Sequence, residues 1–148
     1  MRYLLLSPLL LLAACGRDTP DEQRQTPEAS TDGAAQPSAL AVFAAGTRDR
    51  LCLDERNGRA GLIAYGEGRN NCSLSGSVER SGSALTISPD GDLSCRVQAT
   101  VAGDSITLGE VGGACAYYCG PSVSLDGRTF GRMEAADPVT DLAGDPLC

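Results

Sequence analysis

The cysteines carry the most reactive side chains of this chain, and Cys115 and Cys119 are the two that lie closest together in sequence. Three residues, Ala-Tyr-Tyr, separate them. Redox dithiols use two intervening residues, and a cysteine zinc site needs a second ligand pair at suitable spacing, which is missing here. We therefore favour structural bridging over a redox or metal site at Cys115 and Cys119, and we expect no metal and no cofactor.

Carboxylates are the other side chains that could do chemistry, because the chain contains no histidine and all 12 basic residues are arginine. This composition excludes a Ser-His-Asp triad, a Cys-His pair, histidine-ligated zinc and a lysine Schiff base. An enzyme would have to use carboxylates alone, for instance a glycan-cleaving pair among Asp54, Glu55, Glu67 and Glu110, with two carboxyls about 5 to 9.5 Å apart on one groove. Short chains rarely build a deep cleft, so we do not expect an enzyme.

Tyr117 and Tyr118 are the best candidate binding residues, because tyrosine often anchors binding surfaces and these two lie between two cysteines. The competing interpretation is core packing, since alternation would bury one of the two rings. Asp90-Gly91-Asp92 lacks the further ligands of a calcium loop and is interpreted as a turn. Ser122 has no neighbouring base and receives no catalytic role.

Short runs of alternating apolar and polar residues predict β-strands, and no segment has a helical period. The clearest run is 94–101, in which Cys95, Val97, Ala99 and Val101 share one face. Further predicted strands are 50–53, 60–65, 72–78, 84–88 and 106–108. Turn residues separate them at 57–58, 81–83, 89–92 and 102–105, and a last hairpin is expected from Val123 and Leu125 through Asp126-Gly127 to Phe130.

About eight short strands in some 110 residues predict one all-β domain over residues 39–148, a small antiparallel meander that forms a barrel or a sandwich. We favour the barrel, because closure removes exposed strand edges in a chain without lysine to protect them.

The N-terminus has the pattern of an export signal. Arg2 supplies a positive charge, an apolar run follows, and Leu12-Ala13-Ala14-Cys15 ends it. The run is too short to span a bilayer as a helix, which needs about 20 residues. Residues 12–15 resemble the lipobox of bacterial lipoproteins. The resemblance implies cleavage after residue 14, lipidation of Cys15 and anchoring in a membrane. Gly16 rather than aspartate follows the cysteine, which in that family favours the outer membrane, and we expect the periplasmic face.

Residues 15–38 contain no large apolar side chain, which predicts a disordered tether with a mean reach of about 25 to 30 Å. Six cysteines remain beyond Cys15, and in an exported domain they predict up to three disulfides. Fifteen pairings are open. We prefer bridges between neighbouring strands and expect Cys148 to tie the C-terminal tail to the body. The six are Cys52, Cys72, Cys95, Cys115, Cys119 and Cys148.

The layout of lipobox, polar tether and small disulfide-bridged β domain resembles the membrane-bound lysozyme inhibitor lipoproteins. Their inhibitory Ser-Gly-x-basic stretch has no counterpart, because Ser81-Gly82-Ser83 is followed by Ala84. The Cys-x-Tyr-Tyr-Cys-Gly segment is similar to that of small outer-membrane lipoproteins without a known activity.

The sequence thus predicts a lipid-anchored, non-catalytic binding module whose partner is an envelope protein or polymer. The alternatives are a lysozyme-inhibitor-like protein and a passive structural lipoprotein of the envelope. Nucleic acid is not expected as a partner, because the formal net charge is −7 at pH 7.

Overall fold

The computed structural model describes residues 40–148. The expectations for the signal peptide (1–14), for lipidation of Cys15 and for the tether (15–38) lie outside the described residues. No helix within the described part of the chain has the length and hydropathy needed to cross a membrane.

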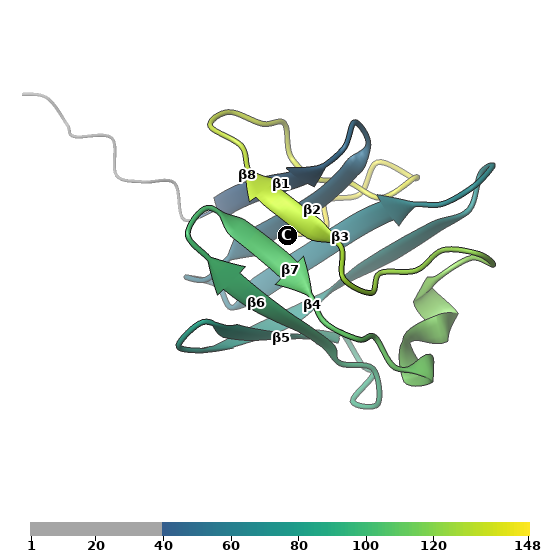
Figure 1. Ribbon diagram of the computed structural model, residues 1–148, viewed down its shortest axis with the longest axis horizontal. Coiled ribbons are helices and arrows are strands. Elements are labelled where there is room, and N and C mark those ends of the chain that lie inside the picture. The colour runs from purple at the N-terminus through teal and green to yellow at the C-terminus, as the bar shows by residue number, and fades with distance from the viewer. Residues whose placement is uncertain (1–39) are drawn as a thin grey trace, which may run out of the picture. The chain divides into compact units, whose positions relative to one another are not determined.

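Eight antiparallel strands and one short 3-10 helix make up this domain (Figure 1). They are β1 (Leu40–Ala45), β2 (Asp49–Asp54), β3 (Arg59–Tyr65), β4 (Asn71–Ser81), β5 (Ala84–Pro89), β6 (Val97–Ala102), β7 (Ser105–Leu108), η1 (Gly113–Tyr118) and β8 (Thr129–Arg132).

Each strand pairs with the next one in sequence, and β8 returns to pair with β1, where Phe43 lies opposite Arg132. The predicted antiparallel meander is therefore confirmed, and it closes as a barrel rather than folding as a sandwich.

Two of the hairpin connections are two-residue loops whose first residue is glycine. Gly82-Ser83 joins β4 to β5 and Gly103-Asp104 joins β6 to β7, and each glycine has a φ near 60° (Gly82 61°, Gly103 57°). This is the arrangement of a type II′ turn, whose twist matches that of the flanking strands. The hairpin predicted at 57–58 is also present, but with a four-residue loop, because the Asp54 carboxylate holds both the amide and the side chain of Asn57.

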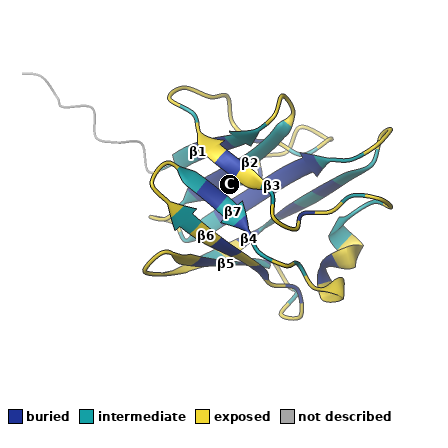
Figure 2. Ribbon diagram, viewed as in Figure 1, coloured by how far each residue is buried: buried dark blue, intermediate teal, exposed yellow. Residues whose placement is uncertain are grey.

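The barrel interior is filled by apolar side chains from all eight strands. Figure 2 colours the ribbon by burial and shows the buried positions along these strands. Every strand contributes at least one, and examples in strand order are Phe43, Leu51, Leu62, Leu74, Leu85, Val97, Ile106 and Phe130. Since the interior of the barrel is packed, the surfaces available for function are its ends and its outer wall.

The outer wall of β1–β3 is also apolar and is covered by the C-terminal tail, residues 133–148. Val42, Cys52 and Ile63 form a second buried cluster with Val139 and Leu147 of the tail. The disulfide between Cys52 and Cys148 fixes the end of the tail there. The expectation that Cys148 ties the tail to the body is thus confirmed.

Three details of the predicted strands are wrong. The alternation predicts no strand at β1, because a strand buried on both faces has a continuous apolar sequence. Strand β6 begins at Val97 rather than at residue 94, since the Asp92 carboxylate holds the amides of Ser94 and Cys95 in a turn. Val123 and Leu125 form no strand with Phe130. Instead β8 pairs with β7 and β1, and η1 precedes these two residues.

Candidate binding site at the closed end of the barrel

Residues 109–128, which join β7 to β8, form a closing segment at one end of the barrel (Figure 1, right). Two disulfides attach it to other elements. Cys115 of η1 bonds to Cys95 in the β5–β6 connection, and Cys119 bonds to Cys72 of β4. Neither bridge joins neighbouring barrel strands, so that preference is wrong, although Cys72 and Cys119 do face each other across a single antiparallel bridge.

Arg128 attaches the closing segment to the barrel a third time. Its guanidinium pairs with the Asp49 carboxylate and donates to the carbonyls of Tyr65 and Ser124. Asp49 also accepts the amide of Tyr65, at 2.9 Å. This half-buried network joins the ends of three elements and stops the closing segment from swinging outward.

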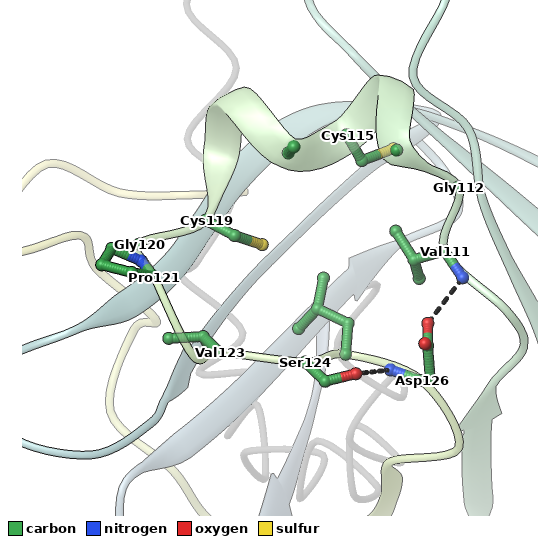
Figure 3. Close-up of a pocket in the computed structure, with 12 residues that line it drawn as sticks. Val111, Gly112, Cys115, Cys119, Gly120, Pro121, Val123, Ser124 and Asp126 are labelled. Carbon is green, nitrogen blue, oxygen red and sulfur yellow. Dashed lines mark hydrogen bonds between the residues drawn. The ribbon is translucent and has the colours of Figure 1, made fainter.

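A pocket of about 350 Å³ opens within the closing segment, between η1 and residues 120–126 (Figure 3). Its walls come entirely from residues 111–126 and combine apolar side chains such as Val111, Val123 and Leu125 with main chain. At the rim of the pocket, the Asp126 carboxylate accepts a hydrogen bond from the Val111 amide at 2.7 Å, which links the two ends of the lining stretch. Cys115 and Cys119, which line the pocket, are both held in disulfides and present no free thiol. The pocket can therefore contact a ligand through its apolar walls and its polar rim.

Tyr117 and Tyr118 lie in η1 rather than in a strand, and their two side chains differ in exposure. Tyr118 is half-buried against the core, whereas Tyr117 is 91% exposed. The two rings meet edge to face with their centres 5.4 Å apart. Leu93 in the β5–β6 connection is 82% exposed. Tyr117 and Leu93 each lie two residues from one half of the Cys95–Cys115 disulfide. Two large apolar side chains thus project from a cross-linked part of the surface.

The Tyr118 hydroxyl donates to the Asp92 carboxylate at 3.2 Å. Partial burial, followed by the charge of Asp92, raises the pKa of Tyr118. The pKa of Asp92 is lowered, first by the hydroxyl of Ser94 and then by the backbone amide of Ser94. Tyr118 therefore stays a neutral donor and Asp92 an ionised acceptor at neutral pH, which fixes the orientation of η1.

Ser122 has a φ of 64°, a left-handed conformation that is uncommon outside glycine, and no other described non-glycine residue has a positive φ. It occupies the third position of a turn in which the Val123 amide donates to the Gly120 carbonyl, with Pro121 second. Glycine or asparagine usually fills that position. Strained backbone of this kind concentrates at functional sites, and here it lies beside the pocket.

The carboxylates considered for catalysis lie in different places. Asp54 and Glu55 are at the β2–β3 loop, where Asp54 holds Asn57 and Glu55 pairs with Arg80. Glu67 is in the β3–β4 loop and Glu110 is in the closing segment. The turn predicted at 89–92 is present, and Asp90 pairs with Arg59 from it. Among residues 40–148, no three cysteine or acidic side chains gather as a metal site would require.

The pocket, the Asp92 contact and the Arg128 network do not follow from the sequence pattern. One signal does point to the closing segment, which is its length. Twenty residues between consecutive strands exceed an ordinary hairpin loop, and long connections are usually functional. Leu93, by contrast, carries no signal, because its exposure depends on the turn made by Asp92.

Comparisons of the chain with protein-family models, with curated proteins and with solved structures find no match.

Proposed function

We propose that this chain is a lipid-anchored envelope lipoprotein whose barrel is a non-catalytic binding module, with the closing segment as its binding element. The observation that carries the proposal is a single segment, held by two disulfides and by Arg128, that contains both a pocket of about 350 Å³ and the exposed Tyr117. The partner we propose is an envelope protein or polymer.

Rigidity supports binding as the role of this segment. A loop that is already fixed loses little conformational entropy when a partner docks, so more of the contact energy appears as affinity. Tyrosine suits such a site, because its large ring contributes contact area and loses the freedom of only a few torsions on binding.

The anchor is proposed from residues 12–15, and substitution of Cys15 tests it. We expect the wild-type chain to fractionate with membranes and to incorporate labelled palmitate, whereas Cys15→Ser does neither. Several acyl chains are needed for firm anchoring, since one alone binds marginally. Membrane association that survives Cys15→Ser would contradict the lipid anchor.

The binding role is tested with the oxidised chain as bait on detergent-solubilised envelope, followed by mass spectrometry of what is retained. We expect a partner that is held by the wild type, lost with Tyr117→Ala, and still held by Leu142→Ala. Leu142 is a matched control, because it is a large apolar residue, 67% exposed, in the C-terminal tail. A partner retained equally by all three baits contradicts the role of Tyr117, and an empty wild-type bait contradicts an envelope partner.

A further inference from the structure

A second pocket, the tail pocket, lies on the outer wall of the barrel between β2–β3 and residues 133–140 of the C-terminal tail. Its volume is about 330 Å³. The tail covers Cys52 and Gly61 with Leu147 and Cys148, but farther along the same strands it leaves a gap. From this pocket we infer that the protein binds a small organic acid, with the carboxylate held by Arg48 and Arg50.

The two arginines come from the β1–β2 turn and the start of β2. Arg50 lies opposite Ile63 across the β2–β3 pair, Arg48 lies in the turn that precedes β2, and both line the pocket. The guanidinium carbon of Arg48 lies 4.4 Å from the centre of the Tyr65 ring. Arg50 donates to the carbonyls of Thr47 and Asp49. Both cations are thus oriented before any ligand arrives.

Neither arginine is paired with a carboxylate of the described residues, in contrast to Arg59, Arg80, Arg128 and Arg132. Asp49 lies between them in sequence, but the alternation of the strand turns it away, and Arg128 and the Tyr65 amide occupy it. In a chain with 19 acidic residues and 12 basic ones, two arginines without acidic partners in one pocket indicate a site for an external anion.

The rest of the lining specifies the kind of anion. Asp137 lies on the wall, so two positive charges meet one negative charge, a balance that suits a monoanion better than a phosphate dianion. Ile63, Met133 and Val139 are apolar and suit an aliphatic body. The volume is at the lower end for ligand sites, which limits the ligand to a small molecule.

The test is an NMR titration of isotope-labelled chain 40–148, which contains the whole barrel, its core and all three disulfides. The probes are 4-methylpentanoate, its neutral counterpart 4-methylpentan-1-ol, and inorganic phosphate. We expect 4-methylpentanoate to shift the signals of Arg48, Arg50 and Tyr65 saturably, with a dissociation constant on the order of 1 mM, and the other two probes to bind at least fivefold more weakly.

Arginine variants locate the binding. We expect Arg48→Ala to weaken 4-methylpentanoate binding at least fivefold and Arg69→Ala to leave it unchanged, because Arg69 is exposed and lies outside this pocket. Arg50→Lys keeps the charge but loses the planar fork, and it should weaken binding while the spectrum stays folded. Equal binding of the alcohol or of phosphate, unchanged binding by Arg48→Ala, or the absence of a saturable shift would each overturn the inference.

Discussion

Gly61 shows how the absence of one side chain decides where the C-terminal tail lies. A Cβ built at this position would meet the carbonyl oxygen of Leu147 at 2.4 Å and its Cβ at 2.6 Å. The neighbouring atoms are main chain and the base of a side chain, which cannot swing aside. Glycine therefore allows Leu147 to approach the β3 wall and Cys148 to reach Cys52.

We expect Gly61→Ala to lower the free energy of unfolding by about 1 to 3 kcal/mol, the usual cost of overpacking. Gly131→Ala is the matched control, because Gly131 also lies in a strand but has open space where its Cβ would stand. Denaturant unfolding of both variants measures the difference. Equal free energies of unfolding for Gly61→Ala and Gly131→Ala would contradict the account that the tail needs a glycine at residue 61 to pack against β3.

Asp92 makes the closing segment sensitive to acid. Its pKa is lowered in the folded state, so its contribution to stability is present above the ordinary value of 3.8 and is lost as the pH falls through the lower, folded value. We expect the ring signals of Tyr118 to shift with this titration below pH 3.8. In Asp92→Asn the same signals should not titrate in that range. A wild-type Tyr118 that is unaffected by acid would contradict the coupling.

At the scale of the element, the closing segment is held in place by links to residues that are far away in sequence. Its two disulfides close separations of 20 and 47 residues, and Arg128 reaches Asp49, 79 residues away. The segment has little regular structure of its own beyond η1. Its shape, and with it the pocket, therefore depends on these links more than on local propensity.

Removing the Arg128 link should loosen the segment. We expect Arg128→Ala to cost about 2 kcal/mol, since it breaks charge-assisted hydrogen bonds and leaves the half-buried Asp49 without its cation. Arg80→Ala should cost less than about 1 kcal/mol, because its pair with Glu55 is exposed. Thermal unfolding, together with hydrogen exchange of residues 109–128, measures both effects. Equal costs would contradict a special role for Arg128.

At the scale of the whole molecule, short apolar runs beside the 57–58 turn predict β2 and β3, and alternation predicts β4 to β7, which bury one face and leave the other more exposed. It does not predict β1, which is buried on both faces by Phe43 inside and Val42 under the tail. Alternation also cannot predict how the six cysteines pair, because the pairing depends on where η1 and the tail pack against the barrel. The candidate site was predictable only as Tyr117 and Tyr118, and its pocket arises from tertiary contacts.

The Cys52–Cys148 disulfide closes most of the domain into one loop, with a sequence separation of 96. We expect Cys52→Ala with Cys148→Ala to lower stability by about 4 kcal/mol, because the unfolded chain gains freedom. Fast hydrogen exchange should appear at residues 139–148 while the barrel strands stay protected. Leu142→Ala is the control within the same tail. An unchanged unfolding midpoint in the cysteine variant would contradict this account.

The barrel has a polarity along its axis. Strand β1 begins at Leu40, next to the β2–β3 loop, whereas the closing segment lies at the opposite end, beyond the β1–β2 turn (Figure 1). The described part of the chain thus begins at one pole, and the closing segment, with the exposed Tyr117, lies at the other. For the binding role that we propose, a partner that docks on the closing segment therefore leaves the opposite pole, at which β1 begins, uncovered.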